Sequence, residues 1–169
     1  HGNTSRPEGM PADCGFVQGD LLDAAAPGKM IDESFALRPN LDLLVCNAGS
    51  FFDRSFLDMG AEEWDRTLNL NVRSAYFTVQ AFAREMVARK RGGAVVIVSS
   101  TNGFQAEEES TAYDTSKGAL VMMTRTLAQA LAPHGIRVNG MAPGLIRTPL
   151  TRGWIDSQHA KRHHYEKKI

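Results

Sequence analysis

The sequence predicts an α/β protein in which a doubly wound parallel sheet lies between two layers of helices, a three-layer α/β/α arrangement. Two observations carry this prediction. Short apolar runs rich in β-branched residues alternate with longer segments of helical periodicity, as parallel strands alternate with crossover helices. These runs are apolar almost throughout, which is typical of strands buried on both faces. We expect a single domain over residues 1–169, because no internal repeat or low-complexity linker interrupts the pattern.

The first half of the chain contains two of the predicted strands. Residues 15–18 form the first run, and residues 23–37 form a helix that turns Met30, Ile31 and Phe35 toward a sheet. Residues 41–46 form the next strand, which breaks at Asn47-Ala48-Gly49. A long helix is predicted over residues 61–89, since apolar residues recur there near helical spacing until Gly92-Gly93.

The second half repeats the alternation. Residues 94–98 are the clearest strand in the sequence and lead directly into Ser99-Ser100. A second long helix over residues 112–132 stops at Pro133-His134-Gly135, and a strand over residues 136–141 ends at Ala142-Pro143-Gly144. Polar or flexible residues thus follow the predicted strands at Asp20, Asn47, Ser99 and Pro143. Ligands of open α/β sheets bind beyond the carboxyl ends of the strands, so these segments predict one cleft.

Composition excludes several classes of protein. The chain has 43% apolar and 22% charged residues, which is ordinary for a globular domain. Its 19 basic residues balance 19 acidic ones, so no net field attracts nucleic acid or an anionic membrane. No apolar stretch approaches the roughly 20 residues that cross a bilayer. Cys14 and Cys46 are too few for a disulfide framework and have no metal-ligand spacing. We expect a soluble, cytoplasmic protein without a metal site.

Tyr113 and Lys117 are the strongest candidates for chemistry. They stand at i and i+4 near the start of a predicted helix and therefore share one face. A phenol has an ordinary pKa near ~10, and a neighbouring ammonium stabilises its phenolate. Ser100 ends the clearest strand 13 positions before Tyr113, so one strand-loop-helix connection can bring its hydroxyl to the phenol. Asn71 lies inside the long predicted helix, although asparagine has a low helix propensity. Each residue alone is also compatible with an ordinary surface or a satisfied buried side chain.

Together these residues resemble the short-chain dehydrogenase/reductase family, whose fold is Rossmann-like. Asn71, Ser100, Tyr113 and Lys117 match its catalytic Asn-Ser-Tyr-Lys tetrad, in order and at similar spacing. Asn47-Ala48-Gly49 is similar to its Asn-Asn-Ala-Gly segment, with Cys46 where the first Asn usually stands. The run from Val138 to Pro149 is similar to its late nicotinamide-binding segment.

The resemblance implies NAD(P)-dependent hydride transfer between a nicotinamide cofactor and a small alcohol or carbonyl substrate of sugar, ketone or 3-oxoacyl type. Tyr113 would exchange the proton with the reacting oxygen, Ser100 would hydrogen-bond that oxygen, and Lys117 would lower the phenol pKa and hold the nicotinamide ribose. Asn71 would hold a water that relays protons from Lys117. The resemblance also implies a set of cofactor-binding residues: Asp20, Leu21, Asn47, Ala48, Gly49, Tyr113, Lys117, Pro143, Gly144, Ile146 and Thr148.

The sequence departs from the family at its ends. It begins at His1 and contains no glycine-rich turn of the kind with which the family opens, so we expect a part of a longer protein, incomplete at both ends. Two other functions stay open. One is a catalytically silent relative that binds a nucleotide or a partner, and the other is an isomerase or dehydratase that uses the same Tyr and Lys.

Cofactor choice, assembly and substrate are less strongly indicated. NAD-dependent members place a carboxylate at the end of the second strand, where this chain has Gly2 followed by Asn3-Thr4-Ser5-Arg6, which favours NADP over NAD. The two long helices carry surplus apolar residues, including Phe77, Phe82, Met122 and Met123, so we expect a homo-oligomer, a dimer or tetramer. Two charged segments, Glu107-Glu108-Glu109 and residues 152–168, either border the substrate or form solvated surface.

Overall fold

Three parallel strands form the sheet of the computed structural model, which describes residues 1–52, 54–149 and 151–157. The strands β1 (Leu43–Cys46), β2 (Gly93–Val98) and β3 (Ile136–Met141) lie in the order β1-β2-β3. Leu44 pairs with Val95, which in turn pairs with Val138. The parallel order and the helical crossovers confirm the predicted Rossmann-like α/β fold.

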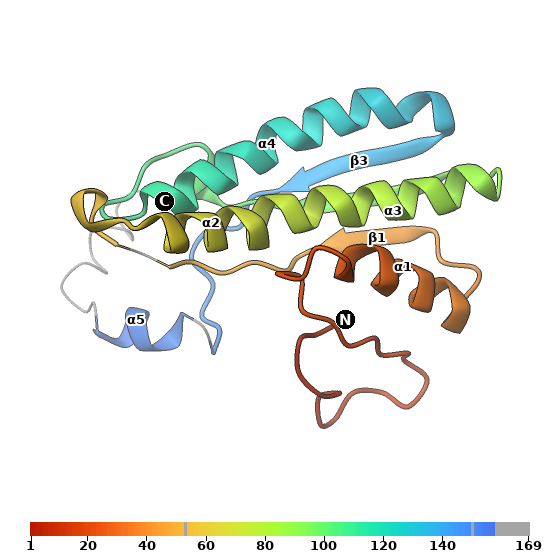
Figure 1. Cartoon of the computed structure of the whole chain (residues 1–169), viewed down its shortest axis with the longest axis horizontal. Coiled ribbons are helices and arrows are strands. Elements are labelled where there is room, and N and C mark those ends of the chain that lie inside the picture. The colour runs from red at the N-terminus through yellow and green to blue at the C-terminus, as the bar shows by residue number, and fades with distance from the viewer. Residues whose placement is uncertain (53, 150, 158–169) are drawn as a thin grey trace.

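Three helices cover one face of this sheet (Figure 1). The helix α1 (Ala26–Leu37) packs on α3 (Ser74–Ala88), α3 packs on β1 and β2, and α4 (Thr111–Leu131) packs on β3. Strand residues alternate accordingly. Val95, Ile97, Ile136 and Val138 are buried under the helices, whereas Leu43, Val45 and Met141 on the opposite face are 55%, 51% and 52% exposed. The described residues therefore supply two of the three predicted layers.

The core lies between α3 and the sheet. Val79, Phe82 and Met86 of α3 are almost completely buried, and the ring of Phe82 lies 6.0 Å from that of Phe35 on α1. Met30, Ile31 and Phe35 face inward as predicted. Counting Phe82 among the surplus apolar residues of the long helices is therefore wrong, because its side chain is part of the core. Phe77 and Met122 are 39% and 54% exposed, whereas Met123 is half-buried against the core.

The predicted long helix over residues 61–89 contains a π-turn. It consists of α2 (Ala61–Leu68), a π-helical segment (Asn69–Arg73) and α3 without a break in the chain direction. The Ser74 amide donates to the carbonyl of Asn69, five residues earlier, which is the π-helical pattern. The extra residue turns Asn71 inward, so a candidate catalytic residue sits at the irregular point of the helix.

Two predicted elements near the N-terminus differ from the structure. Residues 15–18 form one parallel bridge, between Gly2 and Gln18, rather than a strand. The first helix begins at Ala26 rather than at residue 23. The carboxylate of Asp23 accepts a hydrogen bond from the Ala25 amide in a turn, and Pro27 then opens the helix. The strands over 94–98 and 136–141 agree with the sequence to within one residue.

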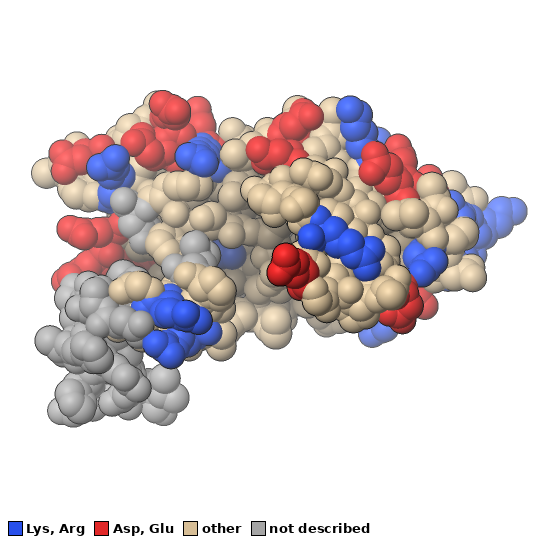
Figure 2. Space-filling view, turned by 90° about the horizontal axis from the view of Figure 1, so that it is seen from below, with Lys and Arg blue, Asp and Glu red and all other residues tan. Residues whose placement is uncertain are grey.

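Short helical segments complete the described chain: η1 (Phe56–Asp58), η3 (Thr101–Gly103), η4 (Ala132–His134) and α5 (Arg152–Ser157). None of the helices in the described ranges has the length and apolarity needed to cross a membrane. On the face shown in Figure 2, acidic and basic side chains are interspersed rather than gathered into a patch of one sign.

Candidate active site

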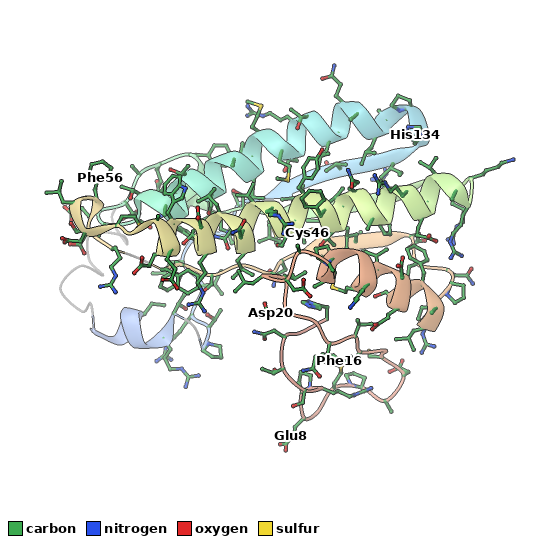
Figure 3. The ribbon with its side chains drawn as sticks, viewed as in Figure 1. Glu8, Phe16, Asp20, Cys46, Phe56 and His134 are labelled. Carbon is green, nitrogen blue, oxygen red and sulfur yellow. The ribbon has the colours of Figure 1, made fainter. Side chains whose placement is uncertain are left out.

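The carboxyl ends of the three strands lie at one edge of the sheet, as parallel pairing requires. The backbone ties the segments that follow β2 and β3 together, because the Ser99 amide donates to Met141 O at 2.7 Å and the Thr101 amide to Pro143 O at 3.0 Å. Figure 3 places Cys46 at the end of β1, with Asp20 on the same side, and His134 at the far end of α4. The four predicted segments therefore reach the same region of the molecule.

Asn71 joins the segment after β1 to the two long helices. The residue is 1% exposed, and its side chain pairs with the backbone of Ser50, accepting from the amide at 2.9 Å and donating to the carbonyl at 2.8 Å. Its second amide hydrogen is donated to Ser116 Oγ on α4, also at 2.9 Å. Both side-chain donors are therefore used within the protein. A relay water would contact Asn71 only at Oδ1 or at the backbone carbonyl.

Gly49 lies where these groups come closest. A Cβ at this position would stand 3.1 Å from Asn71 Oδ1 and 3.5 Å from Lys117 Nζ. The segment Asn47-Ala48-Gly49 is itself exposed, so its backbone is open to a ligand. Glycine thus allows the close approach of backbone, amide and ammonium, because a methyl group here would press on the Asn71 side chain.

Lys117 brings a buried charge to the site. Only 5% of the residue is exposed, and its ammonium donates to Val98 O at 3.3 Å. Burial lowers the pKa of Lys117 from 10.5 to about 8, since desolvation disfavours the charged form. An ammonium has three donors, and the described residues give it one acceptor. Its remaining donors suit a neighbouring pair of hydroxyls.

Tyr113 stands beside this ammonium, as the i and i+4 spacing predicts. Lys117 Nζ lies 5.3 Å from the centre of the half-buried Tyr113 ring. The ring of Phe51 packs edge-on against Tyr113 with centroids 6.1 Å apart. Phe51 follows the Asn47–Ser50 segment and forms one wall beside the phenol. Sequence reasoning missed it, because a lone Phe in a loop carries no signal.

Ser100 is held at the end of β2 by the turn that follows it. Its Oγ accepts a hydrogen bond from the Asn102 amide at 3.1 Å and so caps η3. The neighbouring Ser99 donates its hydroxyl to Lys117 O at 2.8 Å, which fixes the strand end to α4. A Cβ at Gly103 would lie 2.8 Å from Ser99 Oγ and 2.9 Å from Lys117 O, so η3 packs directly on the helix that carries Tyr113.

The predicted cofactor-binding residues are placed unevenly. The side chain of Leu21 lies in the hydrophobic core, so only its backbone can meet a cofactor. Asp20 is exposed, and its Oδ1 accepts from the Leu22 amide at 3.0 Å. Pro143, Gly144 and Ile146 follow β3, and Gly144 has open space beside its Cα apart from a methyl group of Thr101 at 4.0 Å.

Thr151 organises the end of this late segment and was not predicted. Its hydroxyl donates to Ile146 O at 2.7 Å and accepts from the Thr148 amide at 2.9 Å. The hydroxyls of Thr148 and Thr151 lie 3.0 Å apart. Thr148 is therefore held in a turn that leads into α5. Most of the charged segment predicted over residues 152–168 lies outside the described residues.

Cys46 lies at the end of β1 and is partly buried against the core. Burial raises the pKa of the Cys46 thiol to about 12, so the thiol stays protonated at neutral pH. Ser50 and Ser116 hold Asn71, and sequence reasoning missed both because serine is common in loops and helices.

An apolar groove between α3 and α4, with a volume of about 460 Å³, lies toward the His134 end and away from this site.

Comparison with known proteins agrees with this geometry. A family model of short chain dehydrogenases matches residues 7–159. Human dehydrogenase/reductase SDR family member 4 is 40% identical over 132 residues, covering 77% of this chain and 47% of that protein. L-rhamnose 1-dehydrogenase (NAD(P)(+)) of Azotobacter vinelandii is 38% identical over 136 residues, 80% of this chain and 53% of that protein.

A solved structure of ElxO with NADP bound is similar in fold, with a TM-score of 0.77 and 28% identity over 85% of this chain and 58% of that one. The chain spans about half the length of the two curated relatives. The family match over most of the chain and the likeness to these relatives lead to one conclusion: the chain belongs to the short-chain dehydrogenase family of oxidoreductases.

Proposed function

We propose that the full-length protein is an NAD(P)-dependent oxidoreductase that interconverts a small alcohol and its carbonyl compound, with Tyr113 as the acid-base residue. The observation that carries this proposal is the buried ammonium of Lys117 beside the Tyr113 ring, 5.3 Å from its centre. Burying a lysine costs free energy, and this one has a single backbone acceptor among the described residues. Groups with perturbed pKa values of this kind gather at functional sites.

The residues suit a nicotinamide dinucleotide. The free donors of Lys117 match the vicinal hydroxyls of a ribose, and the exposed backbone of Asn47-Ala48-Gly49 lies beside them. Ile146 and Thr148, with Pro143 and Gly144 before them, would hold the carboxamide. The nicotinamide group, when bound, supplies or accepts the hydride.

The chain's own residues handle the proton. In reduction, Tyr113 donates its hydroxyl proton to the carbonyl oxygen as that oxygen gains electron density, and in oxidation it removes the proton from the alcohol. The Asn102 amide occupies one lone pair of Ser100 Oγ, so the Ser100 hydroxyl proton can be donated to the reacting oxygen. Asn71 holds the segment after β1 against α4 and thereby fixes Gly49 beside Lys117.

Sugars, ketones and 3-oxoacyl thioesters are the substrate classes we propose to test first. The relative from Azotobacter vinelandii is named for a sugar and for either cofactor, which supports a polar substrate. NADP is the preferred cofactor in this proposal. The resemblance puts Gly2 where NAD-dependent members of the family carry a carboxylate, and a glycine has no side chain to supply one. Gly2 lies beside residues 17–19, with its amide donating to Val17 O and its carbonyl accepting from the Gly19 amide.

Cofactor oxidation and reduction by the full-length protein across these substrate classes tests the proposal. We expect turnover with at least one class, and a loss of about 100-fold or more in kcat for Tyr113→Phe with cofactor Kd nearly unchanged. Phe51→Leu serves as a packing control, because it changes the ring contact and leaves the phenol. A Tyr113→Phe variant with wild-type kcat would refute the assignment. Product formation without net cofactor consumption would indicate an isomerase or dehydratase, and binding without turnover a silent relative.

A further inference from the structure

We propose that Asp114 is a positioning residue that holds the Ser100 hydroxyl in register with Tyr113, acting through Asn102. The inference rests on the proposed function, since it concerns the geometry of the same reaction. Asp114 directly follows Tyr113 on the first turn of α4, and Asn102 lies two positions after Ser100.

Both carboxylate oxygens of Asp114 are bonded to the segment that follows β2. Oδ1 accepts from Asn102 Nδ2 at 2.7 Å, and Oδ2 accepts from the Glu107 amide at 2.8 Å. These are the lengths of charge-assisted hydrogen bonds. The side chain is half-buried, and the first turn of a helix favours a negative charge. One carboxylate thus joins three points of the chain.

The Asn102 branch continues to the reacting hydroxyl. Asp114 fixes the Asn102 side chain, and the backbone amide of the same residue donates to Ser100 Oγ at 3.1 Å. This amide determines which lone pair of Ser100 is occupied and hence where its proton can point. The route from the Tyr113 helix to the Ser100 hydroxyl therefore runs through two hydrogen bonds.

The clamp formed by Asp114, Asn102 and the Glu107 amide acts on orientation rather than on the fold. Other contacts hold η3 against α4 without Asp114, namely the Ser99 hydroxyl on Lys117 O and the close packing of Gly103 on the helix. Loss of Asp114 should leave the strand end docked while the Asn102 side chain and the Glu107 amide lose these acceptors. Misplacing a reacting group by about 1 Å costs up to about 100-fold in rate.

A charge exchange between the two partners gives a specific test. In Asn102→Asp, two carboxylates face each other and repel. When Asn102→Asp is combined with Asp114→Asn, the amide group introduced at position 114 can donate to the carboxylate introduced at position 102. The oxygen of that amide group still accepts from the Glu107 backbone amide, so both hydrogen bonds can form again. Asp114→Asn alone is a mild change, because an amide flip of Asn102 restores a donor-acceptor pair.

Steady-state kinetics of the full-length protein should separate these variants by their kcat. We expect Asp114→Ala and Asn102→Asp to lower kcat by about 10- to 100-fold with cofactor KM little changed. The exchanged double variant should return to within about 3-fold of the original kcat. Thr115→Asp is the matched control, because it adds a charge one residue away on the exposed side of the same turn and should leave kcat unchanged.

A second cycle tests whether Asp114 acts through Ser100. In a Ser100→Ala background, Asp114→Ala should lower kcat by less than about 2-fold further, because the positioned hydroxyl is already absent. Full additivity of the two changes would overturn the proposal, and so would failure of the exchanged double variant to recover activity.

Hydrogen exchange separates this proposal from the proposed function. The Glu107 amide donates to Asp114, so exchange over residues 102–108 should rise about tenfold in Asp114→Ala, with α3 unchanged. Asn102→Asp should raise exchange as well, and the exchanged double variant should restore protection. If no substrate class shows turnover even for the unmodified protein, the proposed function fails. If exchange over residues 102–108 is unchanged in these variants, the proposed role of Asp114 fails, whether or not the protein shows turnover.

Discussion

Replacing Lys117 with Met should stabilise the protein at neutral pH while abolishing its activity. Burial lowers the pKa of this lysine from 10.5 to about 8, so keeping it charged at pH 7 costs the folded state about 3 kcal/mol. Methionine has a similar length and no charge, and it fills the same space without a cavity. The lost hydrogen bond to Val98 O, 3.3 Å long, contributes about 1 kcal/mol. The variant should therefore be more stable by about 2 kcal/mol at pH 7.

The sign of the pH dependence follows from the lowered pKa. Between pH 8 and pH 10.5 the unfolded chain binds more protons at this lysine than the folded protein does, so the free energy of unfolding rises with pH. The cost is fully present below about pH 8 and falls to about 1 kcal/mol at pH 10. The stability difference between Lys117→Met and the unmodified protein should thus shrink from about 2 kcal/mol at pH 7 to near zero at pH 10.

Denaturation of the full-length protein without cofactor, in urea and by heating at both pH values, measures this difference. For a protein of about 150–250 residues, 2 kcal/mol corresponds to a rise in Tm of about 4–8 °C. Lys29→Met on α1 is the matched control, because it replaces a lysine outside the core and away from the site and should show no such difference. A Lys117→Met protein that is less stable at pH 7, or whose stability difference is the same at pH 7 and pH 10, would refute the reasoning.

Three further predictions concern other parts of the molecule. Gly49→Ala should destabilise the fold by about 1 kcal/mol and lower kcat, because its Cβ would press on Asn71 Oδ1 at 3.1 Å; wild-type values in urea denaturation and kinetics would contradict this. The value of kcat/KM should be higher with NADP than with NAD, and this preference should decrease in Arg6→Ala. A preference for NAD that survives this change would show that Gly2 is not at the ribose. The full-length protein should sediment as a homo-oligomer at micromolar concentration, with the exposed Phe77 and Met122 in its interface, and a monomer would reject this prediction.

The sequence alone determined the elements whose signal is local. The strand over residues 93–98 is apolar and rich in β-branched residues, and the strand over residues 136–141 lies between a glycine turn and a proline, so both were located to within one residue. The Tyr113 and Lys117 pair was also predictable, because a helix places i and i+4 on one face whatever surrounds it. Helical periodicity predicted α4 and most of α1 for the same reason.

The tertiary structure decided which polar groups meet and what this does to them. Asn71 bonds to residues 21 and 45 positions away, and the π-turn that admits it leaves no trace in the apolar spacing of the helix. From the sequence, Phe82 is one of the apolar residues that a single sheet face does not need. In the structure it lies in the core, because α1 covers the side of α3 that the sheet leaves open. The pKa of Lys117 depends on how much water the folded chain removes from its ammonium. Local sequence encodes the periodicity of burial along one element, whereas hydrogen-bond partners and desolvation arise only when distant elements pack together.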